Sequence, residues 1–327
     1  MPKARQTKQA KVQEPSVWKG QSYITTAGVT IAACEELFAK ADELRQRIAL
    51  GEAIRVAEGK VLALCFLEPS TRTMCSFSAA MQRLGGGVIN VTPSDSSIAK
   101  GETLQDTIKC LASYADAIVL RHPVKGSTTT AKEAVSKPII SAGDGVGEHP
   151  TQALLDLYTI IKEHSPLPDV LHVTFLGDAK NGRTVHSLAR LLARYLGQRV
   201  KVTYVCPVES LRMPRELYQE LSAMGLDQHE ESSMDAVLPS TDILYVTRVQ
   251  KERFDSVEAY NQCKGTFVVN AAAMAKLKAS ARVLHPLPRV DEIDVAVDTD
   301  LRASYFRQME HGMYVRMALL GLVLGVL

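Results

Sequence analysis

The chain reads FLEPSTRTM at residues 66–74. This stretch closes an apolar run, residues 61–67, that predicts a buried strand, and it opens a helix for which Ser70 is the expected N-cap. The hydroxyl and backbone N–H groups of residues 70–73 gather at the start of that helix, where its dipole is positive. A strand followed by a helix start of this kind suits a phosphate group.

Arg72 lies in the first turn of the same helix. A cation at this position opposes the dipole of an isolated helix, so its presence is best explained by a dianion bound between the two. The competing interpretation is a capped surface helix that carries a solvated arginine. This segment alone supports the two interpretations equally.

The same arrangement recurs along the chain. Further apolar, often β-branched runs predict strands, each followed by polar residues, at 117–120, 138–140, 173–176, 243–246 and 281–284. In an open parallel α/β sheet, ligands bind beyond the carboxyl ends of the strands. The cationic and histidine side chains at those ends therefore predict one site for a polyanion, built from Arg72, Arg121, His149, Arg183, Arg248 and His285.

The length of 327 residues exceeds what one hydrophobic core usually organises and predicts two α/β domains of about 150 residues each. Pro150 suits the first position of a helix, so we expect the boundary there. We expect a disordered tail or linker remnant at residues 1–19 and a first domain at residues 20–149. A second domain is expected at residues 150–303, and a last helix that packs back on the first domain at residues 304–327.

Composition excludes several classes of partner. The net charge of +2 gives no basic patch on the scale that nucleic acid requires. The apolar C-terminal run, residues 317–327, is much shorter than the roughly 20 residues that span a bilayer, and it predicts the end of a buried helix. Six cysteines without Cys-x-x-Cys spacing are typical of reduced core thiols, which favours a cytoplasmic location.

Several of these motifs resemble those of the transcarbamoylases. STRT at residues 70–73, RHP at 121–123 and HPTQ at 149–152 resemble the carbamoyl-phosphate site that the family shares. TRVQKER at 247–253 and HPLPR at 285–289 resemble the aspartate branch, and the Ser-Met-Gly and His-Cys-Leu-Pro motifs of the ornithine branch are absent. The resemblance runs from about residue 20 to the C-terminus. Met74 and Ser141 depart from the arginine and asparagine common in the family, at positions that the chemistry does not need.

The resemblance implies two doubly wound parallel-sheet domains joined by helices. It implies transfer of the carbamoyl group of carbamoyl phosphate to the α-amino group of L-aspartate, giving N-carbamoyl-L-aspartate and phosphate in pyrimidine biosynthesis. No cofactor, metal or covalent enzyme intermediate is implied. It also implies a homotrimer with shared sites, and eukaryotic relatives are commonly one domain of a multifunctional polypeptide.

Two alternatives to this function stay open. One is an ornithine-type or other transcarbamoylase that acts on a different amine, and the other is a catalytically silent scaffold domain. A nicotinamide dehydrogenase is disfavoured, because residues 177–182 lack the G-x-G-x-x-G spacing.

The resemblance assigns three overlapping sets of site residues. Catalysis is assigned to Arg72, Thr73, Lys100, Arg121 and His149. Carbamoyl-phosphate binding is assigned to Ser70, Thr71, Arg72, Thr73, Ser96, Lys100, Arg121, His149, Gln152, Pro286 and Leu287. Aspartate binding is assigned to Lys100, Arg183, Arg248, Gln250 and Leu287. Ser96 and Lys100 are expected to complete the site of the adjacent subunit, with Ser97 as an alternative to Ser96.

The histidines are expected to differ in role. We expect neighbouring cations to lower the pKa of His149 and keep its imidazole neutral, so that it polarises the carbonyl group instead of acting as a base. The alternative is that His149 only caps the helix at Pro150. His122 and His285 are expected to orient their loops. Residues 251–253 are expected either to form a solvated loop or to contact the substrate.

Overall fold

The structure is a computed structural model that describes residues 16–93, 101–249 and 265–327, together with Phe254, Ser256, Glu258 and Tyr260. Most of the predicted tail, residues 1–19, lies outside the described residues. So do Ser96, Ser97, Lys100, Gln250 and residues 251–253.

The first sheet has four parallel strands in the order β2-β1-β3-β4. The strands are β1 (Val61–Phe66), β2 (Gly87–Val91), β3 (Ala117–His122) and β4 (Ile139–Asp144). The helices around them are α1 (Ile31–Ala49), α2 (Thr71–Arg83), α3 (Leu104–Tyr114) and α4 (Ser127–Ala134). The central strands are buried almost throughout, as expected for a parallel sheet with both faces covered.

The second sheet has five parallel strands in the order β7-β6-β5-β8-β9. The strands are β5 (Leu171–Leu176), β6 (Val200–Val205), β7 (Asp227–Glu231), β8 (Ile243–Val246) and β9 (Arg282–Leu284). The α-helices are α6 (Arg183–Leu196), α7 (Arg215–Ala223), α8 (Met234–Val237) and α10 (Ala271–Lys276). Short 3-10 helices lie at Gly197–Arg199, Glu209–Leu211, Leu238–Ser240 and Val295–Thr299. The predicted fold class of two parallel α/β sheets is confirmed.

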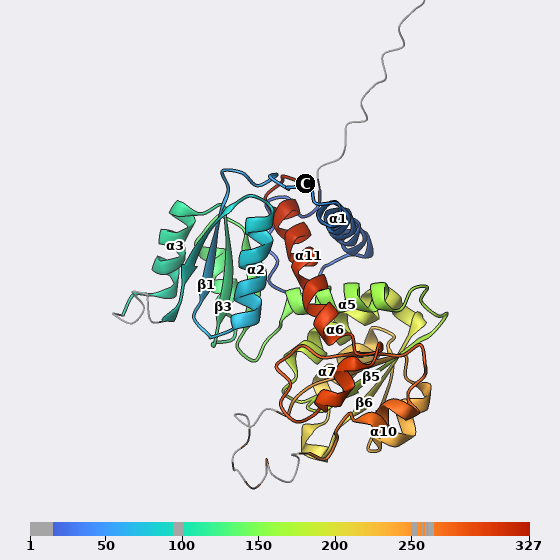
Figure 1. The fold of residues 1–327 in the computed structure, drawn as a ribbon. Coiled ribbons are helices and arrows are strands. Elements are labelled where there is room, and N and C mark those ends of the chain that lie inside the picture. The colour runs from blue at the N-terminus through green and yellow to red at the C-terminus, as the bar shows by residue number, and fades with distance from the viewer. Residues whose placement is uncertain are drawn as a thin grey trace, which may run out of the picture.

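Two helices join the sheets: α5 (Pro150–Glu163) and α11 (Tyr305–Val323). In Figure 1, α11 runs from the second sheet back to the first, beside α1 and α2. Every residue of α5 from Pro150 to Ile160 is buried, which identifies it as a central core helix.

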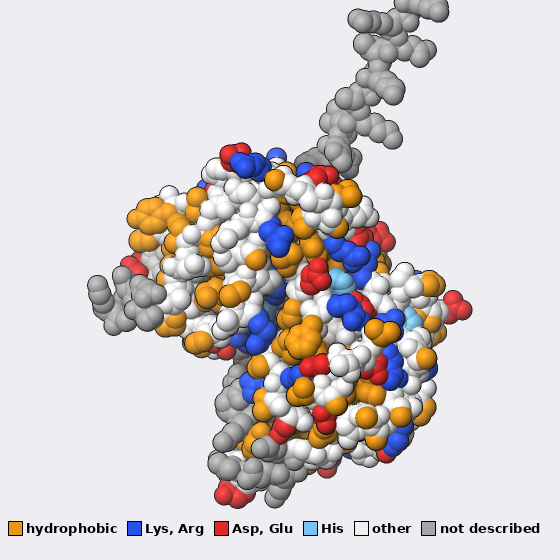
Figure 2. All heavy atoms as spheres, in the orientation of Figure 1, with side chains coloured by type: hydrophobic (Ala, Val, Ile, Leu, Met, Phe, Trp, Pro, Cys, Tyr) orange, Lys and Arg blue, Asp and Glu red, His pale blue; other side chains and the backbone are white. Residues whose placement is uncertain are grey.

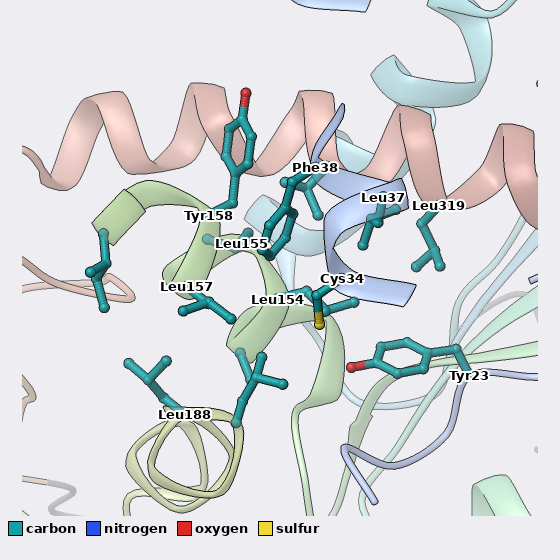
Figure 3. Packing of buried hydrophobic residues seen from close by; sticks show 14 of the residues in the cluster. Tyr23, Cys34, Leu37, Phe38, Leu154, Leu155, Leu157, Tyr158, Leu188 and Leu319 are labelled. Carbon is teal, nitrogen blue, oxygen red and sulfur yellow. The ribbon is translucent and has the colours of Figure 1, made fainter. Parts of the chain in front are cut away.

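The side chains of this junction form one core. Figure 3 shows Leu37 and Phe38 of α1, Leu155 of α5, Leu188 of α6 and Leu319 of α11 directed toward a common interior. The two sheets therefore share a continuous hydrophobic cluster instead of being linked by a loose tether.

The cysteines only partly match the expected core thiols. Cys34, Cys65 and Cys206 are buried, and burial raises the pKa of the Cys34 and Cys65 thiols to about 12. Cys75 and Cys110 are exposed, because neither belongs to the buried faces of α2 and α3. Among the described residues, no helix is long and apolar enough to cross a membrane.

We expect Gly145→Ala to destabilise the protein more than Gly225→Ala. Both glycines have positive φ, +54° and +83°, so each substitution carries the roughly 1–2 kcal/mol cost of a left-handed residue. A Cβ at Gly145 would also lie 2.5 Å from the carbonyl oxygen of Pro123, whereas one at Gly225 meets nothing within 4 Å. Urea unfolding measures both variants, and equal losses of stability would contradict the close approach at Gly145.

Candidate active site

The carboxyl ends of both sheets border one cavity of about 760 Å³. This cavity lies between the lobe built on the first sheet and the lobe built on the second. Figure 2 shows basic side chains along the groove where the lobes meet. Each site residue assigned from the sequence that the structure describes lines this cavity: Ser70, Thr71, Arg72, Thr73, Arg121, His149, Gln152, Arg183, Arg248, Pro286 and Leu287. These side chains come from segments far apart in the sequence, so the fold brings them together.

The predicted anion-binding helix start is α2. Ser70 has the extended backbone of an N-cap, with φ −159°, but its side chain makes no capping hydrogen bond. Ser70 lines the cavity together with Thr71 and Arg72 of the first turn of α2. Thr73 is buried beneath them.

Arg121 and Arg183 converge on one carboxylate. The Nη2 atoms of Arg121 and Arg183 lie 3.2 Å and 3.5 Å from Oε2 of Glu68. Arg121 also donates from Nη1 to the carbonyl of Ala142 at 3.0 Å, and Arg183 donates to the carbonyl of Gly145. Both guanidinium groups are thus held in place, one from each lobe.

The arginines of the cavity also repel one another. Burial and the nearby charges of Arg183 and Arg72 lower the pKa of Arg121 to about 10, although Glu68 acts in the opposite direction. Burial and the charge of Arg248 lower the pKa of Arg72. Cations packed closely enough to disfavour their own charge are a strong site for a dianion, which removes the repulsion and accepts their hydrogen bonds.

His149 is 5% exposed and stands at the N-cap position of α5. Its backbone N–H donates to Oγ of Ser187 at 3.1 Å, but its side chain makes no capping hydrogen bond, so the structure does not support the capping alternative. Burial, and secondarily the charges of Arg121, Arg183 and Arg316, hold the pKa of His149 well below 6.5. The predicted direction is right, but burial contributes more than the cations that the prediction invoked.

The segment 285–288 is held by its own histidine. The Leu287 N–H donates to Nδ1 of His285 at 2.7 Å, which leaves Nε2 of a neutral ring to donate to Glu292 at 2.6 Å. Leu287 has φ +56°, a strained conformation for a branched residue that these contacts maintain. The Nδ1 atom of His122 similarly accepts from the N–H of Val124 in the loop after β3 and contacts Ser127 at the start of α4, so both loop-orienting predictions agree with the observed contacts.

Two charged residues of the cavity were given no role from the sequence. Glu68 lies inside the FLEPSTRTM stretch at residues 66–74, and Arg316 lies in the buried helix α11. Arg316 donates from Nη1 to Ser76 at 2.8 Å and lies 5.0 Å from the ring centre of Phe77. An isolated arginine within the apolar part of α11, residues 313–323, was the signal that could have identified it.

A helix start and a set of arginines, on opposite sides of a cleft between two α/β domains, define a two-domain protein with a site suited to anionic small molecules. The chain belongs to the aspartate/ornithine carbamoyltransferase family. Its residues 21–162 match the carbamoyl-P binding domain of that family, and residues 169–323 match the Asp/Orn binding domain.

Individual relatives agree with the family assignment. The chain is 53% identical to multifunctional protein pyr1-3 of Dictyostelium discoideum over 88% of its own length, but it spans only 13% of that relative. It is 46% identical to the aspartate carbamoyltransferase catalytic subunit of Thermococcus onnurineus over 95% of this chain and 99% of that protein. The chain also resembles a solved structure, aspartate transcarbamoylase from Trypanosoma cruzi with carbamoyl phosphate, with a TM-score of 0.89 and 42% identity. The match covers 95% of this chain and 98% of that one.

We expect His149 to make the folded state sensitive to acid. Below pH 6.5 the unfolded chain binds a proton that the folded imidazole, with its lowered pKa, does not, so stability falls as pH falls. The limiting slope for one group is about 1.4 kcal/mol per pH unit. Between roughly pH 7.5 and pH 5.5, the unfolding free energy of the wild type should therefore fall more steeply than that of His149→Gln. Parallel curves would contradict a neutral, buried His149.

Proposed function

We propose that this chain transfers the carbamoyl group of carbamoyl phosphate to L-aspartate, forming N-carbamoyl-L-aspartate and phosphate for pyrimidine biosynthesis. The observation that carries the proposal is the single cavity in which the predicted phosphate-binding residues of one lobe face Arg183 and Arg248 of the other. Aspartate transcarbamoylase from Trypanosoma cruzi has been solved with carbamoyl phosphate, with aspartate and phosphate, and with carbamoyl phosphate and aspartate together, which supports these substrates.

The first lobe suits carbamoyl phosphate. The start of α2, with Arg72, would hold the phosphate, and Arg121 would reach both the phosphate and the carbonyl oxygen. Thr73, Arg121 and neutral His149 are the proposed donors to the oxyanion that develops on attack, a task worth a few kcal/mol for each well-placed donor. Gln152 and the carbonyl groups of Pro286 and Leu287 would accept from the carbamoyl nitrogen.

The second lobe suits aspartate. Arg183 and Arg248 can each form paired hydrogen bonds with a carboxylate, which positions the α-amino group of aspartate toward the carbamoyl carbon. A C–N bond forms as the C–O bond to phosphate breaks, and the departing phosphate takes the proton of the amine. Gln250, assigned to the same task, lies outside the described residues.

Direct assay separates this proposal from its two alternatives. The purified chain should form carbamoyl-aspartate from carbamoyl phosphate and aspartate and give no product with ornithine. Product with ornithine in place of aspartate would support the ornithine-type alternative. Absence of product with either amine would support the silent scaffold domain.

We expect two arginine substitutions to separate the substrates. Arg72→Ala should raise the KM for carbamoyl phosphate, and Arg248→Ala should chiefly raise the KM for aspartate, each by about 10- to 100-fold, because a charge-assisted hydrogen bond is worth roughly 1.5–3 kcal/mol. Arg190→Ala is the control, because Arg190 pairs with Glu220 at 2.7 Å outside the cavity and should change neither constant. Equal effects of Arg72→Ala and Arg248→Ala on both KM values would contradict the division between lobes.

We also propose a homotrimer in which Ser96 and Lys100 of one subunit complete the site of its neighbour. The family resemblance of this segment supports the proposal. So does the position of β2, which ends at Val91 just before it and is the edge strand farthest from β4 in the first sheet. An edge strand is the natural place for a contact between subunits.

Mixing two inactive variants tests the shared site. Lys100→Ala and Arg72→Ala chains should regain partial activity after subunit exchange, because mixed trimers contain sites in which neither residue is mutated. Native mass spectrometry verifies the exchange. Exchange without recovered activity would place both residues in a site formed by one chain.

The chain is further proposed to act as one domain of a multifunctional pyrimidine-pathway polypeptide in the cytoplasm. Similarity to multifunctional proteins from Dictyostelium discoideum and Squalus acanthias supports the tethering, since this chain spans 13% of each. The described cysteines are free thiols, which supports a reducing compartment.

A further inference from the structure

A buried carboxylate lies behind the cavity without lining it. Asp156, on α5, is completely buried between α5, α11 and β8. Three side chains donate to it: Gln152 Nε2 to Oδ1 at 2.8 Å, Gln308 Nε2 to Oδ1 at 2.6 Å, and the Tyr245 hydroxyl to Oδ2 at 2.7 Å. Asp156 therefore connects the junction helices with the second sheet.

The contact with Gln152 decides which way that amide faces. Burial raises the pKa of Asp156 to about 6, so at neutral pH it is mainly ionised and can only accept hydrogen bonds. Gln152 must therefore turn its amide nitrogen toward Asp156. Because Gln152 lines the cavity, its carbonyl oxygen is left as the group that faces a ligand.

Gln308 carries the same constraint to a second part of the site. Its amide nitrogen donates to Asp156, and its carbonyl oxygen accepts from the backbone N–H of His285 at 2.9 Å. His285 begins the segment whose next two residues, Pro286 and Leu287, line the cavity. One carboxylate thus orients the side-chain acceptor and anchors the backbone acceptors.

These three acceptors are the groups proposed above for the carbamoyl nitrogen. An NH₂ group donates two hydrogen bonds, whereas a methyl group of similar size donates none and would leave the buried acceptors unpaired. A site built to bind a donor rejects an analogue without one strongly. The orientation of the acceptors therefore bears on whether a carbamoyl or an acetyl group is accepted.

We propose that Asp156 is a positioning residue that determines specificity, turning Gln152 and the 285–288 segment so that the site selects a carbamoyl group over an acetyl group. This inference rests on the proposed function. Asp156 does not line the cavity and acts through Gln152 and Gln308.

Two stable phosphonates test the selectivity without catalysis. Phosphonoacetamide carries the amide NH₂, and acetonylphosphonate carries a methyl group at the same position. By calorimetry, Asp156→Leu should weaken phosphonoacetamide binding about tenfold or more and change acetonylphosphonate binding less than about twofold, because only the amide loses partners. Equal weakening of both ligands would show a merely structural role and overturn the proposal, as would an unchanged preference.

Companion variants make the test specific. Asp156→Asn should keep most of the preference, because its oxygen still accepts from both glutamines and its nitrogen can donate to the Tyr245 oxygen. Tyr245→Phe is the matched control: it removes the third donor, touches neither glutamine, and should leave the preference unchanged. The effect of Asp156→Leu should also be smaller in a Gln152→Ala background, and full additivity would overturn action through Gln152.

Gln308→Leu decides the question if Asp156→Leu does not fold. This substitution removes the hydrogen bond from the His285 backbone N–H and should reduce the preference for phosphonoacetamide. An unchanged preference would overturn the proposal. Failure of the wild type to bind phosphonoacetamide would count against the proposed function itself. Wild-type binding with an unaltered preference in the folded variants would count against the inference alone.

Discussion

The repulsion among guanidinium groups gathered at one cleft is the constraint on which the rest of the structure depends. Burial of Arg121, together with the nearby charges of Arg183 and Arg72, lowers the pKa of Arg121, and Glu68 relieves only part of the unfavourable charge. Such an arrangement persists only where a rigid scaffold imposes it. The scaffold is the pair of sheets whose strand ends meet at the cleft, held by the shared core of α1, α5, α6 and α11.

Much of this architecture could be predicted from the sequence. Strands with continuous apolar runs, such as β1 and β3, carry a strong local signal, and the helix at Pro150 begins where its proline indicates. The strands β2, β6 and β7 were not expected. β2 and β7 are edge strands with little buried surface, and β6 alternates buried and half-buried residues, so none has the continuous apolar run of a central strand.

The residues of the candidate site likewise divide into those with a local sequence signal and those without one. Residues that belong to compact motifs, such as Thr73 and Gln152, could be assigned roles because their neighbours in sequence are also their neighbours in space. Asp156, Gln308 and Arg316 could not, since their partners lie far along the chain: Gln308 contacts a residue 152 positions away, and Arg316 one 240 positions away. Their importance follows from burial and geometry, which only the folded chain provides.

The central claim is that the two lobes form one polyanion site, and the affinity of N-(phosphonacetyl)-L-aspartate tests it most directly. A solved relative from Trypanosoma cruzi contains this compound, which joins a phosphonate to aspartate. Calorimetry should show that this chain binds it at least about a hundredfold more tightly than phosphonoacetamide or aspartate alone, because it occupies both sets of arginines at once. An affinity no greater than that of the tighter half would contradict the account.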